Sequence, residues 1–352
     1  MSDNSDIEWT DATWPITVGC DKCSDGCKNC YAMRSVHRVN LCQIGAGKPP
    51  PYKDLVELVT IGGRRVPRWT GVVQFFPERL AMPLRWKRPR RIFVSSQSDL
   101  FHDDVTNQQI ASVFGMMAAC PQHTFQVLTK RAKRMRAWFE WLFSTATRVA
   151  LDEKRDMDIE WLYRLVCSRA AAAAPVGVNF GVEPGPWPLP NVWIGVSVEN
   201  QAAADERIPE LMLTPAAVRW ISAEPLLGPV DLLPWFDPTG ACDCPPGESY
   251  CVGGCAKRAS WRHTEPDGED PNLDWVVMGA ESGPGARAAD PEWFLELAEQ
   301  CEDARVPLFF KQGMPGDNIT AGDGSKVKAG GIISLPYLDG KQHVEMPEVR
   351  RG

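Results

Sequence analysis

The stretch "TFQVLTKRAKRMRAWFEWLF" at residues 124–143 sets the pattern that decides the fold. Its first six residues, 124–129, are rich in β-branched and aromatic side chains and predict a buried strand. Polar and basic residues follow, and from Arg131 onward the apolar side chains recur at helical spacing. The segment therefore predicts a strand, a short polar turn and then a helix over 131–143.

Similar strands recur over most of the chain. Two further helices carry start signals: Thr106 with Gln109 forms a capping-box pattern, and Asp290 before Pro291 is an N-cap followed by a first-turn proline. Alternation of strand and helix predicts a parallel α/β fold, with a barrel as the leading candidate. The strands are expected at "VVQFF" (72–76), "RIFVSS" (91–96), "TFQVLT" (124–129), "VWIGVS" (192–197), "VRWISA" (218–223), "WVVMGA" (275–280) and "PLFFKQ" (307–312).

Polar residues end nearly every one of these strands. In parallel barrels the carboxyl ends of the strands converge on one face, where ligands bind, so these ends are the expected site. Each end taken alone is also explained by ordinary strand termination at Ser, Gly or Pro. The ends are "SSQSD" (95–99), "TKR" (129–131), "SVEN" (197–200), "SAEP" (222–225), "GAESGPGAR" (279–287) and "KQ" (311–312).

Composition narrows the class of protein. The chain has 352 residues, of which 44% are hydrophobic and 24% charged, which is typical of a globular protein with a large core. The start "MSDNSDIEWT" lacks the basic and apolar regions of a signal peptide, and no eighteen apolar residues run together. We therefore expect a cytoplasmic protein, where clustered cysteines favour metal or catalytic roles over disulfides.

The net charge of −7 argues against a protein that is basic all round. Three basic clusters nevertheless lie in the first 140 residues. They indicate either a solvated surface or a rim that contacts phosphates, with Trp69 and Trp86 as stacking surfaces. The clusters are "GGRRVPR" (62–68), "RWKRPRR" (85–91) and "TKRAKRMR" (129–136).

Four cysteines fall within residues 19–32, "GCDKCSDGCKNCYA". Cys23, Cys27 and Cys30 have the spacing C-x3-C-x2-C, and three thiolates on one loop can bind three irons of a [4Fe–4S] cluster while leaving the fourth open. With Cys20 added, the four thiols can instead close a tetrahedral zinc site. Local spacing favours iron–sulfur over zinc, because zinc sites usually separate their cysteine pairs by a longer loop.

Several phrases of the chain resemble a phage-associated protein family with radical SAM features, distantly similar to spore photoproduct lyase. They are "GCxxxSxGCxNCYA", "PLRWKRPRRIFVSSQSDLFHDDV", "PQHTFQVLTKR", "LPNVWIGVSVENQAAADERIPELMLTPAAVRWISAEPLLGPVDL", "WVVMGAESGPGAR" and "VPLFFKQ". The resemblance implies a partial triosephosphate-isomerase-type barrel over residues 1–312, a [4Fe–4S] cluster and S-adenosylmethionine. It also implies an electron donor of the flavodoxin or ferredoxin type, and a C-terminal extension, 313–352, follows the barrel.

The family pattern is commonly C-x6-C-x2-C, which corresponds here to Cys20, Cys27 and Cys30. Cys27 and Cys30 are therefore expected ligands, and Cys20 and Cys23 compete for the third place. From their places at the ends of predicted strands, cofactor contacts are expected from Ser96, Ser98, Asp99, Glu199, Asn200 and Glu224. Substrate or phosphate contacts are expected from Lys130, Arg131, Glu281, Ser282, Arg287 and Lys311.

Two long insertions interrupt the pattern, at 144–190 and 236–273. The second contains "CDCPPGESYCVGGC", a Pro- and Gly-rich segment that predicts a structural zinc knuckle, with a further iron–sulfur cluster or an unmetallated loop as alternatives. Its candidate ligands are Cys242, Cys244, Cys251, Cys255 and His263.

The function expected from these features is radical chemistry on a nucleic-acid base. The phage-type family, the kinship with a thymine-dimer repair enzyme and the basic clusters together favour a DNA or nucleotide substrate. We expect an isomerase that moves a glycinyl adduct on thymine from nitrogen to carbon attachment, during DNA hypermodification that evades host restriction. A lyase on thymine lesions and a zinc-binding DNA-associated accessory protein are the alternatives. A phage-encoded protein would work in the host cytoplasm.

Overall fold

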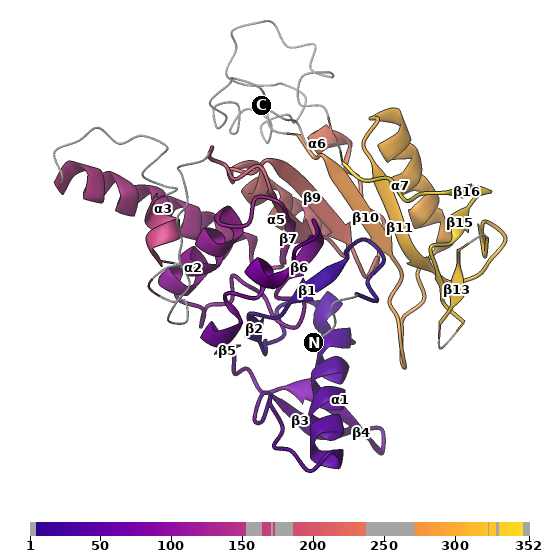
Figure 1. Ribbon diagram of the computed structural model, residues 1–352. Helices are drawn as coiled ribbons and strands as arrows, with labels where there is room; N and C mark the ends of the chain where they lie inside the picture. Colours follow the sequence, from indigo (N-terminus) through magenta and orange to yellow (C-terminus); the bar gives the residue numbers. More distant parts are fainter. Residues whose placement is uncertain are drawn as a thin grey trace, which may run out of the picture. The chain divides into compact units, whose positions relative to one another are not determined.

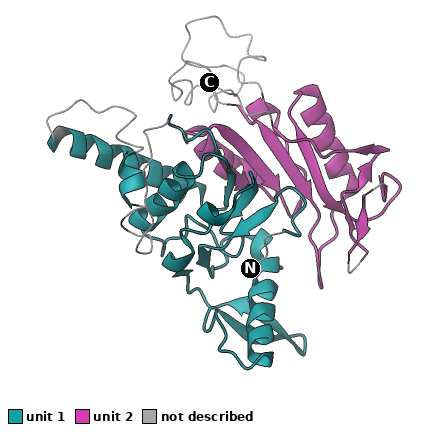
Figure 2. Cartoon of the chain, viewed as in Figure 1, with its two compact units in different colours: residues 1–192 teal, residues 193–352 magenta. Residues whose placement is uncertain are grey.

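The computed structural model describes residues 5–152, 164–169, 172, 186–236, 272–322, 324–328 and 331–347. The chain divides into two compact units, residues 1–192 and 193–352 (Figure 2). In the described part of the chain, no helix has both the length and the apolar character needed to cross a membrane.

Unit 1 is built on three parallel strands (Figure 1). They are β1 (Ala12–Trp14), β6 (Arg91–Val94) and β7 (Thr124–Thr129), in the order β1-β6-β7. Two helices follow the last two strands: α2 (Asn107–Ala118) comes after β6 and α3 (Ala132–Asp152) after β7. Phe114 of α2 and Trp138 of α3 stack with ring centroids 4.4 Å apart, which fixes the two helices against each other.

Outside these strands, unit 1 carries a helix and a hairpin that pack together. Helix α1 (Tyr31–Gly45) contacts both β3 (Val56–Ile61) and β4 (Arg64–Trp69), which pair antiparallel. A separate pair joins β2 (Thr17–Val18) and β5 (Gln74–Phe75). Short 3-10 helices occur at Asp25–Cys27, Pro77–Arg79 and Pro83–Arg85.

Among the described residues of unit 2, the larger sheet has six strands in the order β8-β9-β10-β11-β14-β13. The first four are parallel and the last two are antiparallel to their neighbours. The strands are β8 (Val192–Ser197), β9 (Val218–Ala223), β10 (Trp275–Gly279), β11 (Leu308–Gly313), β13 (Lys326–Val327) and β14 (Ile333–Ser334). The helices are α5 (Gln201–Met212), α6 (Leu233–Phe236) and α7 (Pro291–Asp303). A small sheet, β12-β15-β16, adds Ile319–Thr320, Tyr337–Leu338 and Lys341–Gln342.

The core of unit 2 is aromatic where its strands begin. The Trp275 ring lies 5.7 Å from Trp193 and 5.2 Å from Trp220, and all three side chains are buried. Gly195 makes room for this stack, because a Cβ there would lie 2.5 Å from the Trp220 ring. Large aromatic rings bury much apolar surface, so this cluster stabilises unit 2.

The described elements are mixed α/β with mostly parallel strand pairing, and six of the seven expected strands appear at their predicted places. The strand expected at 72–76 is wrong. Only Gln74–Phe75 is extended there, and it pairs antiparallel with β2, whereas β1 is the strand that joins β6. The partial barrel stays a prediction.

The two predicted helix starts are confirmed in detail. Thr106 Oγ1 accepts a hydrogen bond from Gln109 N at 3.2 Å, and Gln109 Oε1 accepts one from Thr106 N at 2.9 Å. Asp290 caps α7 through Glu292 N. Helix α3 extends beyond the predicted end at 143 to Asp152, inside the first expected insertion.

The segment after Gln312 is Gly-rich and polar, a composition that predicts a loosely attached extension, and this prediction is wrong for its described residues. Strand β14 pairs with β11, and Ile319, Ile333 and Leu338 are buried. Apolar side chains at these positions anchor the segment, although Gly and polar residues dominate its composition.

Candidate functional site

The thiol loop, residues 19–30, lies between β2 and α1 and is tied to the carboxyl end of β6. Gly19 N donates to Gln97 O at 3.1 Å, and Ser98 Oγ donates to Gly19 O at 2.6 Å. Gly19 has φ +99°, and a Cβ there would lie 2.1 Å from Val72 O. Only glycine fits this close approach of two backbones, so Gly19 fixes where the loop begins.

The four thiols of this loop are free and close together. Cys23 Sγ and Cys27 Sγ are 3.8 Å apart. Their hydrogen bond lowers the pKa of the Cys27 thiol to about 5, with the charge of Lys130 acting in the same direction, and it raises the pKa of Cys23. Cys27 is therefore the thiol of this pair that ionises first, which suits a metal ligand.

Cys30 is the N-cap of α1 and its sulfur faces the first turn of that helix. Burial raises the pKa of the Cys30 thiol, while the nearby backbone N–H groups of Ala32 and Met33 act in the opposite direction. A helix amino terminus favours negative charge, so a metal that displaces the proton would find a supported thiolate here.

A buried carboxylate organises the residues around Cys20. Asp99 is 6% exposed and accepts hydrogen bonds from Thr129 Oγ1 at 2.7 Å and Lys130 N at 3.1 Å. The Arg131 guanidinium lies 3.3 Å from the same carboxylate, is ion-paired with Asp21, and has Nη1 3.8 Å from Cys20 Sγ. Asp99 thus joins the ends of β6 and β7 and aims Arg131 at the thiol loop.

Cys20, Asp21 and His102 form a group that can hold a metal ion, because their ligand atoms lie within 4.8 Å of one another. His102 Nε2 is 3.0 Å from Asp21 Oδ1. Burial, followed by the charge of Asp99, raises the pKa of the Cys20 thiol to about 12. Metal binding is compatible with this geometry.

Asp21 and His102 were not among the residues expected from the sequence. The available signal was weak: His102 is one of five histidines and follows the strand-end segment that contains Asp99. Asp21 lies between Cys20 and Cys23, and a residue between two candidate ligands is easily interpreted as a spacer.

The other strand-end residues expected in unit 1 have mainly backbone roles. Ser96 O accepts a hydrogen bond from Tyr31 at 2.8 Å, and Ser98 holds Gly19 as described. The expected stacking surface at Trp86 is wrong: this ring is buried against His123, and Arg90 lies over it at 5.5 Å. Trp69 is half-buried and packs against the cluster that includes Val36 of α1.

In unit 2 the expected strand-end acids are paired with basic side chains. Glu199 is 2% exposed and binds Arg207 at 2.7 Å, while the neighbouring Asn200 caps α5 by accepting from Ala203 N. These two residues therefore position α5, and their expected cofactor roles remain predictions.

Two more strand-end acids of unit 2, which follow β9 and β10, are also ion-paired. Glu224 pairs with Lys311 at 2.9 Å, and Gly279 leaves room for it, because a Cβ there would lie 2.7 Å from Glu224 Oε1. Arg287 clamps Glu281 through its backbone N–H at 2.8 Å and its side chain at 2.6 Å. Ser282, next to this clamp, is half-buried. Since β8, β9 and β10 are parallel neighbours, Glu199, Glu224 and Glu281 lie at one edge of this sheet.

The expected zinc ligands of the second insertion, Cys242, Cys244, Cys251, Cys255 and His263, lie outside the described residues.

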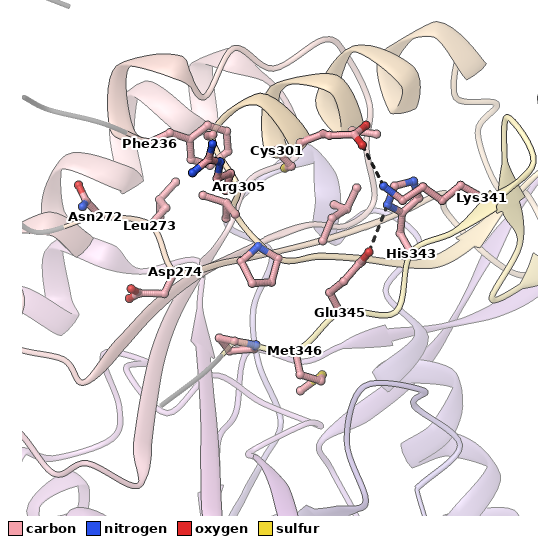
Figure 3. Close-up of a pocket in the computed structure, with 17 residues that line it drawn as sticks. Phe236, Asn272, Leu273, Asp274, Cys301, Arg305, Lys341, His343, Glu345 and Met346 are labelled. Atoms are coloured by element: carbon pink, nitrogen blue, oxygen red, sulfur yellow. Dashed lines mark hydrogen bonds and ion pairs between the residues drawn. The ribbon is translucent and has the colours of Figure 1, made fainter. Parts of the chain in front are cut away.

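A cavity of about 660 Å³ is present in unit 2, and its lining includes none of the expected site residues (Figure 3). Its charged groups largely pair with one another: Lys341 binds Glu302 at 3.2 Å, and His343 Nδ1 lies 3.8 Å from Glu345. Burial lowers the pKa of His343, so this imidazole is neutral near pH 7. The cavity therefore offers few unpaired groups to a ligand.

Comparison with known proteins gives one match. No curated protein and no solved structure is significantly similar to the chain. Residues 4–347 match the family described as "Protein of unknown function (DUF5131)", and the chain therefore belongs to this family.

Proposed function

We propose that this protein is a radical S-adenosylmethionine enzyme whose thiol loop holds a [4Fe–4S] cluster. The observation that carries the proposal is the thiol loop itself, where Cys23, Cys27 and Cys30 have a three-ligand spacing and Cys23 and Cys27 are in contact. Three thiolates and an open iron are what binding of a chelating cofactor requires. When bound, this pair of groups supplies a carbon-centred radical able to remove hydrogen from an unactivated carbon.

The residues around the loop fit a negatively charged cluster. The first turn of α1 faces Cys30, and Lys130 and Arg131 supply positive charge beside Cys27 and Cys20. Cys27 and Cys30 are the constant members of the ligand set. The third thiol is Cys23, which contacts Cys27, or Cys20, which the resemblance favours.

For the substrate, we propose a modified thymine in phage DNA, on which the enzyme moves a glycinyl group from nitrogen to carbon attachment. The α-carbon of such a group is a suitable target, because its amino and carboxyl substituents stabilise the radical left after hydrogen is removed. The role of the chain is to hold that carbon in place and exclude water.

Anaerobic reconstitution with iron and sulfide tests the cluster. The expected result is a brown protein that dithionite bleaches and that releases 5′-deoxyadenosine from S-adenosylmethionine. Cys27→Ala and Cys30→Ala should each lose the bound iron, and only one of Cys20→Ala and Cys23→Ala should do so. Cys42→Ala is the matched control, because this exposed thiol lies on α1 outside the loop. Mass spectrometry of nucleosides from treated phage DNA then tests the isomerisation.

A second candidate function, a zinc-binding accessory protein, is favoured by the Cys20, Asp21 and His102 group. A colourless protein that retains zinc, and loses it in His102→Ala but not in Cys27→Ala, would support it and contradict the first proposal.

A further inference from the structure

Residues 31–70 form a compact arm made of α1, β3 and β4 (Figure 1). Val36 of the helix is buried with Tyr52 and Leu55 of the connecting segment, and Val56 packs against the same cluster. Asn40 Nδ2 also donates to Tyr52 O at 2.9 Å, and Tyr52 N donates to Asn40 Oδ1 at 3.0 Å. The arm is therefore a preorganised element that can present its surface to a partner at low entropic cost.

The charge of the arm is opposite to that of the whole chain. It contains seven Lys and Arg residues against two acidic residues, Asp54 and Glu57, while the chain has a net charge of −7. Five of these basic side chains are exposed, and no acidic group in the described part of the chain pairs with them. They are Arg38, Lys48, Lys53, Arg64 and Arg65. Unpaired positive charge on a rigid element, kept apart from an acidic remainder, fits a polyanion.

The hairpin carries two of these charges at its tip. Gly62 and Gly63 both have positive φ, +56° and +76°, which is the two-residue turn that matches strand twist. The strand pairing sets Arg64 opposite Ile61 and Arg65 opposite Thr60. Successive strand residues point to opposite faces, so the two arginines reach out on both sides of the ribbon.

The dimensions of this tip favour duplex DNA over duplex RNA. The major groove of B-DNA admits a two-stranded ribbon, whereas the major groove of A-form RNA is too deep and narrow for one. Helix α1 starts directly after Cys30, and its 15 residues give it a length of about 22 Å. This length is less than one turn of B-DNA, about 34 Å, and the helix joins the thiol loop directly, so we expect a duplex held by the arm to bring nearby bases to that loop.

We propose that the arm grips the sugar–phosphate backbone of double-stranded DNA, so that the enzyme acts on a base within the polymer and not on a free nucleotide. The identity of the reaction rests on the proposed function, but the DNA contact does not, since it involves no thiol. A base within a duplex must leave the stack to reach a site, and contacts to the backbone on one side of it hold the helix while it does so.

The test measures binding of a fluorescent 20-base-pair DNA duplex by anisotropy, over a series of salt concentrations, with protein free of iron. Arg64→Gln with Arg65→Gln should weaken binding about tenfold or more and reduce the salt slope by about 2, because two phosphate contacts are lost. The matched control is Arg148→Gln with Arg305→Gln, two exposed arginines outside the arm, which should bind as wild type. Unchanged binding by the arm variant, or equal loss in the control, would overturn the proposal.

Two further measurements distinguish DNA from other polyanions, and this proposal from the proposed function. Equal affinity for an RNA duplex of the same length, or for an acidic protein in place of the nucleic acid, would overturn the assignment to DNA. Circular dichroism checks that the arm variant is folded, as expected for substitutions at an exposed tip. If the reconstituted protein releases no 5′-deoxyadenosine, the proposed function is contradicted, while the result on DNA binding still stands.

Discussion

At the residue scale, Asp99 illustrates how one buried carboxylate can organise a site. It accepts hydrogen bonds from the end of β7 and from Phe101 N at 2.9 Å, and it pairs with the Arg131 guanidinium. Its position after β6 was predictable, but the partners were not, because they come from the next strand. Asp99 is therefore best described as a positioning residue for Arg131.

Replacing Asp99 with Asn should destabilise the protein by about 3–5 kcal/mol, because the Arg131 guanidinium loses its buried counter-charge. Urea denaturation measures the free energy of unfolding. Asp103→Asn is the control: this side chain is exposed on the same segment, and its change should stay within about 0.5 kcal/mol. If both variants lowered the free energy of unfolding equally, the buried pair of Asp99 and Arg131 would contribute no more to stability than an exposed carboxylate.

Gly19 gives a second prediction at this scale. Gly19 and Gly71 both have positive φ, +99° and +89°, but a Cβ meets backbone only at Gly19. Gly71→Ala should cost about 1–2 kcal/mol through backbone strain. Gly19→Ala should cost about 1–3 kcal/mol more, because the new methyl group overlaps Val72 O. Thermal unfolding of the two variants would contradict this if their losses were the same.

At the element scale, the short strand β1 is held at its start by an ion pair. Asp11 binds the Arg91 side chain at 2.9 Å and Arg91 N at 2.8 Å. Burial alone would raise the pKa of Asp11, but the hydrogen bonds and charge of Arg91 outweigh it, so this pKa lies below the ordinary value of 3.8. A carboxyl group with a depressed folded-state pKa stabilises the protein above its unfolded-state pKa and stops doing so in acid.

Asp11→Asn should therefore lower the free energy of unfolding near pH 6. The difference from wild type should shrink as the pH falls through and below 3.8, where the folded-state carboxyl also becomes protonated. Urea titrations across this pH range give the comparison. The side chain is partly exposed, so high salt should reduce the effect. A difference that persists in strong acid would exclude the ion pair as its cause.

The elements themselves were largely predictable because local signals agreed. The side chains of Thr106 and Gln109 cap α2, and that of Asp290 caps α7. These caps satisfy backbone groups of their own helices, so both helix starts depended on nearby residues alone. The apolar run at 72–76 led to a wrong prediction of a strand in the parallel sheet. Which strand a segment pairs with cannot be read from the segment itself, and here Gln74 and Phe75 pair antiparallel with Val18 and Thr17. The group of Cys20, Asp21 and His102 escaped notice for a related reason, since 81 residues separate Asp21 from His102.

At the scale of the whole molecule, the candidate site residues of both units are positioned by the same rule. Parallel strands deliver polar side chains at their carboxyl ends, as Asp99 and Arg131 show in unit 1 and Glu224 and Glu281 show in unit 2. Each acid there is held by a basic partner, which orients the side chain. The rule explains why the strand ends could be chosen from the sequence, while the pairing of individual acids with individual bases required the fold.

The division into two units also predicts the effect of metal removal. The stacked Trp193, Trp220 and Trp275 lie in unit 2, whereas the four thiols of the loop belong to unit 1. If the thiol loop holds the proposed cluster, removing its iron should therefore abolish the visible absorbance but leave the near-ultraviolet circular dichroism of these rings unchanged. Cys27→Ala, which removes a ligand without a chelator, should give the same spectrum. Small metal domains unfold when their metal is lost, so a collapse of the tryptophan signal together with the iron would mean that the metal holds the fold.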